Sequence, residues 1–146
     1  MAVSEFKRKL KELEAIINVT LKETIDKNKD VLIDIQTNDQ INKGEDSNGK
    51  QFIPKYAIST KLIKKRKGQP TNRVTLKDTG DFYKSIEIDT STTQAIITAN
   101  VEYFKYLVAH YDGNIILGIQ NDLMREFLKE YFRPNLKKNF RAILSK

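Results

Sequence analysis

The sequence predicts an α+β fold, in which a small antiparallel sheet built around a hairpin at about residues 85–100 is flanked by an N-terminal amphipathic helix and a long C-terminal helix. Apolar residues recur at intervals of three and four near both ends of the chain, which is the period of a helix. Between them, one stretch alternates apolar and polar residues around a turn-rich segment, as hairpin strands do. The length of 146 residues suits a single structural domain, 1–146.

The N-terminal helix is predicted from Ser4 to about Lys27, with Ser4 as its N-cap. One apolar stripe runs along it, formed by Phe6, Leu10, Leu13, Ile17, Leu21 and Ile25. Such a stripe packs against another surface. The pattern leaves open whether that surface belongs to the same subunit or to the next.

A second helix is predicted after Asn28, in "KDVLIDIQTNDQINKG", and ends at Gly44 because glycine readily takes the left-handed conformation that follows a helix. Its first half is also compatible with a strand. The loop from Gly44 to Pro54 leads into "PKYAISTKLIKKRKG", which predicts a short helix with a basic C-terminal end, as the helix dipole favours. Its apolar residues, on or near the helix, are Tyr56, Ile58, Leu62 and Ile63.

The hairpin is predicted in "SIEIDTSTTQAIITAN", around the turn-rich "DTSTT". Its apolar residues are Ile86 and Ile88 in one arm and Ala95, Ile97 and Ala99 in the other. The stretch "VEYFKYLVAHY" follows with helical spacing and is ended by Asp112 and Gly113. From Ile119 the chain is helical again, and Pro134 should kink or restart that helix.

Composition narrows the classes of function. The chain has no cysteine, so a disulfide, a thiolate nucleophile and a thiolate zinc site are excluded. A histidine-based relay would depend on His110 alone. No apolar run approaches the roughly 20 residues that span a bilayer, and the charged N-terminus does not resemble a signal peptide. We therefore expect no membrane association, no cofactor, and synthesis in a cytoplasm.

The net charge of +7 is concentrated in one part of the chain. Between Lys43 and Arg73 there are nine basic and two acidic residues, a surplus equal to that of the whole protein. Such a segment can contact nucleic acid or an acidic partner, or can simply form a solvated face. The candidate contact residues are Lys61, Lys64, Lys65, Arg66 and Lys67.

The stretch "GEDSNGKQ", which starts at Gly44, is one letter short of the phosphate-binding pattern G-x-x-x-x-G-K-[ST]. Gln51 stands where that loop needs a hydroxyl, and Glu45 and Asp46 would place negative charge around an anion. As a calcium loop, the stretch would have Lys55 where a carboxylate is required. We predict a structural turn here.

Several short motifs occur in a characteristic order. The pattern G-x-D-x-x-G-x-x-F/W-x-P is matched by Gly44, Asp46, Gly49, Phe52 and Pro54. The pattern L-x-D-T-G-x-x-x-x-S-I is matched by Leu76, Asp78, Thr79, Gly80, Ser85 and Ile86. Looser matches are Tyr103, Phe104 and Gly113 to Y-A-x-x-x-x-x-G, and Leu117, Gly118 and Ile119 to a Phe-Leu-Gly-Leu element.

Over about residues 30–135, this order resembles the virion-morphogenesis or tail-completion family of tailed bacteriophages, the head-tail joining or neck proteins. One departure is that the arginine-proline often found before the last element is absent from "NIILGI". The resemblance implies a non-enzymatic virion protein, assembled in the host cytoplasm. It would form a homo-oligomeric sixfold or twelvefold ring between portal or adaptor and tail, with weak, non-specific contact with passing DNA.

The matched residues also have a physical interpretation. Asp78, Thr79 and Gly80 predict a compact turn in which the Asp and Thr side chains accept hydrogen bonds from nearby backbone N–H groups and the glycine takes a left-handed conformation. Phe52 is predicted to anchor the loop before Pro54 to the core. A plain helix cap is the alternative for the Asp78 turn.

Two other functions are compatible with the residues. A stand-alone basic nucleic-acid-binding protein is suggested by the pI of 9.5, although the aromatic residues lie on apolar stripes and not among the basic ones. A small hydrolase or nuclease would need carboxylates such as Asp78, Asp81, Glu87 and Asp89 to converge on a metal ion.

Overall fold

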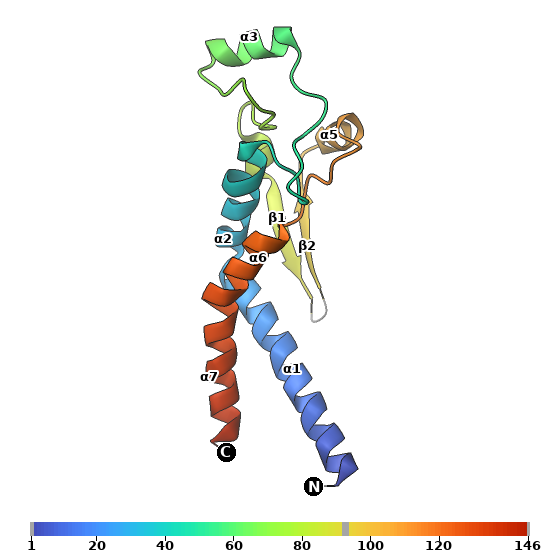
Figure 1. Cartoon of the computed structure of the whole chain (residues 1–146), viewed down its shortest axis with the longest axis vertical. Coiled ribbons are helices and arrows are strands. Elements are labelled where there is room, and N and C mark those ends of the chain that lie inside the picture. Colours follow the sequence, from blue (N-terminus) through green and yellow to red (C-terminus); the bar gives the residue numbers. More distant parts are fainter. Residues whose placement is uncertain (1, 92–93, 146) are drawn as a thin grey trace.

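The computed structural model describes residues 2–91 and 94–145 and confirms the α+β class, with a two-stranded antiparallel sheet, a long N-terminal helix and a long C-terminal helix. The molecule is elongated (Figure 1). Helix α3 (Ile58–Arg66) lies at one end, and both chain ends lie at the other, where α1 (Val3–Lys27) and α7 (Arg133–Leu144) diverge.

Helix α1 covers the predicted range, but its N-cap is Ala2 and not Ser4. Ala2 has extended backbone angles, φ −70° and ψ 149°, so the helix starts before Ser4, which therefore has helical backbone and cannot act as the cap. The buried residues of α1 all lie in its C-terminal half: Thr20, Thr24 and Ile25.

The predicted second helix is present, and the strand alternative for its first half is wrong. Helix α2 (Lys29–Asp34) continues into a π-helical segment, η1 (Ile35–Gln40), and a short 3-10 turn, η2 (Ile41–Lys43). Gly44 ends the helix with φ 82°, as predicted. A Cβ atom at Gly44 would lie 3.1 Å from Cβ of Arg73, so a larger residue would need a small shift of Arg73 in addition to a strained backbone conformation.

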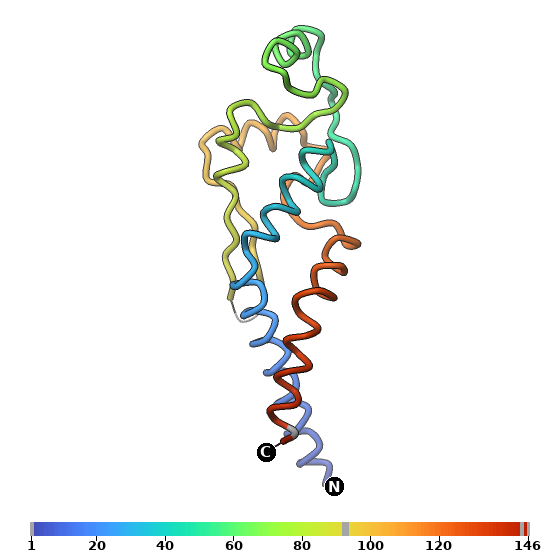
Figure 2. Tube along the Cα trace, turned by 90° about the vertical axis from the view of Figure 1, so that its left-hand side faces the viewer, coloured from blue at the N-terminus to red at the C-terminus, as the bar shows by residue number. Residues whose placement is uncertain are grey.

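The hairpin pairs β1 (Ile86–Thr90) with β2 (Ala95–Ala99), and Ile88 lies opposite Ile97. In β1 the residues alternate between buried and exposed, so one face of the strand packs inward. Thr92 and Thr93, in the predicted turn, lie outside the described residues. In Figure 2 the hairpin and the C-terminal helices lie on opposite sides of α1 and α2.

Two groups of buried apolar side chains form the core. The first comprises Ile41, Phe52, Val74, Phe82, Ile86, Tyr111 and Ile116. The second comprises Ile25, Leu32, Ile88 and Phe127. Strand β1 contributes to both through alternate residues, and therefore joins the two groups.

The remaining helices are α4 (Asp81–Lys84), α5 (Phe104–His110) and α6 (Asn121–Phe127), which continues through a π-helical segment, η3 (Leu128–Phe132), into α7. Pro134 lies in the first turn of α7, so the predicted restart is confirmed. Because proline has no N–H, it cannot donate to the carbonyl four residues earlier, and the π-helical segment occupies that turn. Within residues 2–91 and 94–145, none of the helices combines the length and the apolar composition of a transmembrane segment.

Candidate interaction surfaces

The turn after Gly44 is organised by Asp46, which is 1% exposed. Its Oδ1 accepts the backbone N–H groups of Asn48 and Lys50, each at 2.9 Å, and its Oδ2 accepts Nδ2 of Asn114 at 2.8 Å. Burial alone would raise the pKa of Asp46, but these hydrogen bonds lower it below the ordinary value of 3.8. The carboxylate therefore acts as an internal fastener and is not free to bind a ligand.

Two buried glutamines hold the segment before α6. Gln36 donates to the carbonyl oxygen of Ile116 at 3.2 Å and accepts the N–H of Gly118 at 2.7 Å. Gln40 donates to the carbonyl oxygen of Gly118 at 2.8 Å and accepts the N–H of Gln120 at 2.7 Å. Each side-chain amide thus donates one hydrogen bond to the backbone and accepts another from it, as a neighbouring strand would.

Phe52 is the loop anchor that the sequence predicts. It is 2% exposed, and its ring meets that of Tyr111 edge-on, with centroids 5.6 Å apart. Burial, with the nearby Tyr56, raises the pKa of Tyr111 to about 12. The bond from Ile53 to Pro54 is cis.

The turn at Asp78 agrees with the prediction only in part. Oγ1 of Thr79 accepts the N–H of Asp81 at 3.3 Å, and Gly80 has φ 92°, as expected. The Asp78 carboxylate, however, pairs with Nζ of Lys67, which lowers the pKa of Asp78. The prediction that this carboxylate bonds a backbone N–H is wrong, because Lys67 at the end of α3 lies close enough to take it.

Besides the Lys67 pair, Tyr56 just before α3 and Lys64 within it tie this helix to the rest of the molecule. The hydroxyl oxygen of Tyr56 accepts the N–H groups of Thr75 at 3.0 Å and Leu76 at 3.3 Å. Nζ of Lys64 donates to the carbonyl oxygen of Lys77 at 2.8 Å and lies 4.8 Å from the centre of the Tyr56 ring. Lys64 is buried, so this predicted contact residue is a structural lysine instead.

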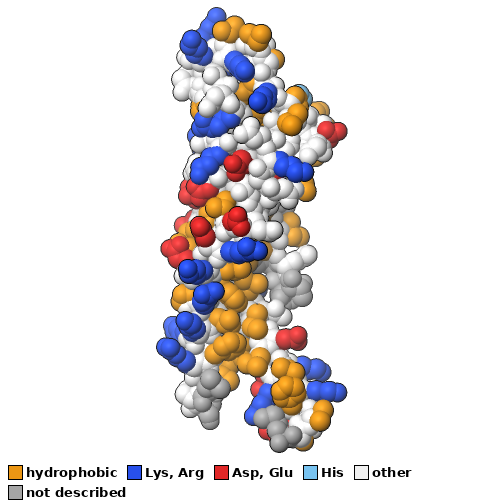
Figure 3. Space-filling view, viewed as in Figure 1, with side chains coloured by type: hydrophobic (Ala, Val, Ile, Leu, Met, Phe, Trp, Pro, Cys, Tyr) orange, Lys and Arg blue, Asp and Glu red, His pale blue; other side chains and the backbone are white. Residues whose placement is uncertain are grey.

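The outer side of α3 combines apolar and basic side chains. Lys64 is buried and Lys67 is paired with Asp78, so among the described residues three of the predicted contact residues are both exposed and outside an ion pair. Ile58 is 78% exposed, and hydrophobic and basic side chains share this end of the molecule in Figure 3. The α3 surface, as we define it, consists of Ile58, Lys61, Leu62, Ile63, Lys65 and Arg66.

The apolar stripe of α1 is only half covered. Exposure falls from 71% at Val3 to 38% at Ile17, and the buried residues of the helix all lie beyond Ile17. We use the name α1 stripe for the uncovered part, which consists of Val3, Phe6, Leu10, Leu13 and Ile17. Figure 3 shows hydrophobic side chains on the diverging part of α1 and in the space between α1 and α7.

Helix α7 covers the next part of α1 through polar contacts. Nδ2 of Asn139 donates to Oγ1 of Thr20 at 2.7 Å, and Nδ2 of Asn135 lies 3.4 Å from Oγ1 of Thr24. Both threonines are 0% exposed. The two helices are thus matched by hydrogen bonds near the body of the molecule.

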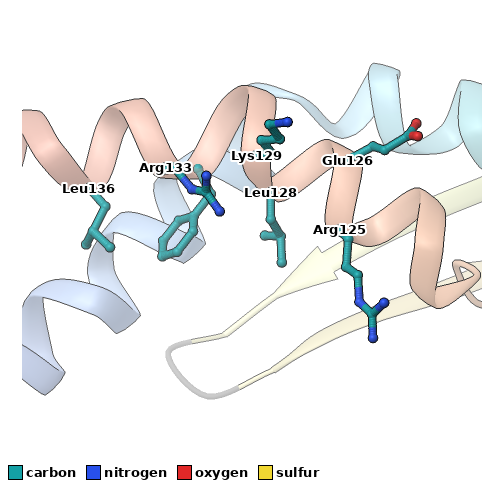
Figure 4. Close-up of a pocket in the computed structure, with 7 residues that line it drawn as sticks. Arg125, Glu126, Leu128, Lys129, Arg133 and Leu136 are labelled. Atoms are coloured by element: carbon teal, nitrogen blue, oxygen red, sulfur yellow. The ribbon is translucent and has the colours of Figure 1, made fainter.

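A second basic surface lies on α7, which has four basic residues and no acidic one: Arg133, Lys137, Lys138 and Arg141. The charge count along the sequence did not reveal this surface, because acidic residues outside α7 offset its surplus of basic residues. A groove of about 470 Å³ adjoins the surface and is lined in part by Leu128, Phe132 and Leu136. In Figure 4, Leu128 and Leu136 lie on the same side of the helix, and Lys129 lies on the other.

The carboxylates proposed for a hydrolase do not converge. Glu87 and Asp89 lie on the exposed face of β1, whereas Asp78 is paired with Lys67 and Asp81 begins α4. Within residues 2–91 and 94–145, no three His, Cys, Asp or Glu side chains form a group that could hold a metal ion.

Comparison of the chain with protein-family models, with curated proteins and with solved structures found no match. The resemblance to bacteriophage neck proteins therefore stays a prediction. The features that the sequence did not reveal include the buried glutamines and the uncovered part of α1, as well as the basic surface on α7. For the glutamines a signal existed: Gln36 and Gln40 follow the buried Leu32 at intervals of four, which places polar groups on the inward face of a helix.

Proposed function

We propose that this chain is a structural protein of a tailed-bacteriophage virion, a neck or tail-completion subunit that forms a homo-oligomeric ring between portal or adaptor and tail. In this proposal the protein has no catalytic role and acts through its surfaces. The order of the motifs from Gly44 to Ile119 supports it, and so does the use of the matched Asp46 and Phe52 as internal fasteners of the fold.

The observation that carries the proposal is a pair of unlike exposed surfaces at opposite ends of the molecule (Figure 1). The α1 stripe is a long apolar strip on a single helix, whereas the α3 surface is compact and both apolar and basic. A closed ring requires two different surfaces on each subunit, because each copy contacts its two neighbours in different ways.

A ring of this kind would surround the path of the DNA. The exposed cations of the α3 surface, Lys61, Lys65 and Arg66, are candidates for the channel wall or for an acidic face of a neighbouring virion ring. Burial of Lys64 and pairing of Lys67 reduce the number of phosphates that this surface can neutralise. Because affinity for DNA grows with that number, the contact would be weak, as a moving duplex requires.

Electron microscopy and native mass spectrometry of the purified protein test the proposal. We expect closed annuli with one sixfold or twelvefold mass. Ile58→Gln should disrupt them while leaving the far-ultraviolet circular dichroism unchanged, since Ile58 is 78% exposed in the monomer. Asp112→Asn, at another exposed position, is the matched control. A protein that stays monomeric at every concentration, or one that turns over a substrate, would refute the proposal.

The alternative is a stand-alone nucleic-acid-binding protein, which the two basic surfaces on α3 and α7 favour. Gel-shift titration over a range of salt concentrations separates the two functions. Tight binding by the monomer, with an affinity that falls steeply as salt rises and a loss on Lys65→Gln with Arg66→Gln, would favour the alternative. Negligible binding would count against it.

A further inference from the structure

The α1 stripe follows the spacing of a coiled-coil seam. Its five residues are separated by intervals of three, four, three and four, and the same rhythm continues to Thr20 and Thr24. In a heptad repeat, Val3, Leu10 and Ile17 take the a positions, and the d positions begin at Phe6. Leu13 and Thr20 continue the d positions.

The residues of the seam are polar where α7 covers them and apolar where they are exposed. Its inner part is threonine, and α7 covers those threonines with asparagine side chains at 2.7 Å and 3.4 Å. Its outer part is entirely apolar and is left 38–71% exposed. An apolar a/d seam of this length is stabilised when a second helix packs on it.

The charges beside the seam match a second copy of the same helix. Lys9 takes the g position, and Glu14 takes the e position of the next heptad. In a parallel coiled coil these two positions of neighbouring helices lie side by side. Within the described residues Glu14 forms no ion pair, and Lys9 has only a 3.7 Å contact with Glu5.

We propose that the N-terminal half of α1 packs in parallel on the same segment of a second copy of this chain, with Lys9 of one copy beside Glu14 of the next. The surface covered is the α1 stripe. In an assembly of more than two copies, each helix offers its Lys9 side to one neighbour and its Glu14 side to the other.

The parallel direction follows from what α7 already covers. In an antiparallel pair that uses the whole stripe, Val3 of one copy would lie opposite Thr20 of the other. Thr20 is 0% exposed and bonded to Asn139, so no partner helix can reach it. In a parallel pair each apolar residue from Val3 to Ile17 meets its own counterpart, and none of them needs to reach Thr20.

This inference deepens the proposed function. Only the number of copies rests on that function, because a parallel contact between α1 helices can form in any assembly of two or more chains. In a ring of more than two copies the contact joins unlike sides of the stripe, because the Lys9 side of one helix meets the Glu14 side of the next. The pair formed by Lys9 and Glu14 also sets the direction of that contact from copy to copy.

Charge reversal tests the pairing in the full-length chain. Glu14→Lys places Lys9 beside a lysine, and association measured by sedimentation velocity should weaken about tenfold, the effect of changing weak attraction into repulsion. Lys9→Glu combined with Glu14→Lys should restore it. Within one helix the double variant is no better than the single one, since the new carboxylate at position 9 would repel Glu5, so recovery can arise only between copies.

Lys7→Glu is the matched control, since Lys7 lies on the Glu14 side of its own helix and meets no Glu14 in a parallel pair. It should leave association unchanged. An effect equal to that of Glu14→Lys would show an antiparallel pair and overturn the proposal, as would failure of the double variant to recover.

Replacement of both Leu10 and Leu13 by glutamine tests the seam itself. Both are exposed in the monomer, and glutamine keeps the helix propensity, so the protein should fold and lose association through α1. Association that survives this change refutes the inference even if rings are seen. Conversely, loss of a dimer that never forms rings leaves the inference standing and refutes the proposed function.

Discussion

Asp46→Asn is the most informative single change in the folded chain, because it removes a charge while keeping the shape of the side chain. The asparagine oxygen can still accept the two backbone N–H groups of Asn48 and Lys50. The third contact fails, since the new NH₂ group would face Nδ2 of Asn114. Rotation of the Asn114 amide does not relieve this, because its Oδ1 accepts the N–H of Ile53 at 3.1 Å and its Nδ2 donates to the carbonyl oxygen of Gln51 at 3.1 Å.

The size of the effect follows from these contacts. Two hydrogen bonds change from charge-assisted to neutral, which costs about 0.5–1 kcal/mol each. One buried donor is left facing another donor, which costs about 1–2 kcal/mol. We therefore expect the free energy of unfolding to fall by about 3 kcal/mol, whereas Asp112→Asn, at an exposed site, should change it by less than about 0.5 kcal/mol.

Urea denaturation at several pH values provides the assay. The pKa of Asp46 is lowered in the folded state, so its contribution to stability is present above the ordinary value of 3.8 and is lost as the pH falls through the lower folded value. The difference between the wild type and Asp46→Asn should thus be largest at neutral pH and should shrink in acid. A difference below about 1 kcal/mol, or one that does not change with pH, would refute the assigned role of Asp46.

Three further outcomes are expected. Lys64→Met should lower the free energy of unfolding by about 2 kcal/mol, because the carbonyl oxygen of Lys77 loses the hydrogen bond from Nζ of Lys64. Lys65→Met, at an exposed position, should change it by less than about 0.5 kcal/mol. Equal effects of the two changes in chemical denaturation would contradict the buried position of Lys64. Gln40→Ala should lower it by about 2–3 kcal/mol and speed hydrogen exchange at the amide of Gln120, which loses its acceptor; an unchanged exchange rate would argue against this contact. In a spectrophotometric titration, the Tyr111 phenol should ionise near pH 12. Because that pKa is raised from 10.0, the contribution of Tyr111 to stability is complete below pH 10 and is lost as the pH rises toward 12. Ionisation of Tyr111 near pH 10 would show that its phenol is exposed.

Local patterns were sufficient wherever the local backbone decides the structure. The left-handed glycines at the end of the second helix and in the Asp78 turn were predicted, since few other residues adopt that conformation. The hairpin was predicted from its alternation, and the restart at Pro134 from the missing N–H. Phe52 was predicted as an anchor because a large apolar side chain in a polar loop is most stable when it is buried against the core.

Lys64 shows where such patterns fail. It lies within a run of basic residues, and nothing in that run distinguishes it from Lys65. Burial of Lys64 depends on the carbonyl oxygen of Lys77 and the ring of Tyr56, which reach it only after the chain has folded back. Likewise, Gln36 and Gln40 bond a segment about eighty positions away, so no short window of sequence contains both partners.

By itself, the amino-acid sequence determined the mixed helical and hairpin fold, the glycine that ends the second helix and the presence of an apolar stripe on α1, because each depends on residues within a few positions of one another. Only the tertiary structure decided which cations remain exposed and where α7 stops covering that stripe. Those outcomes depend on which distant groups occupy the same space, and periodicity along a chain carries no information about that.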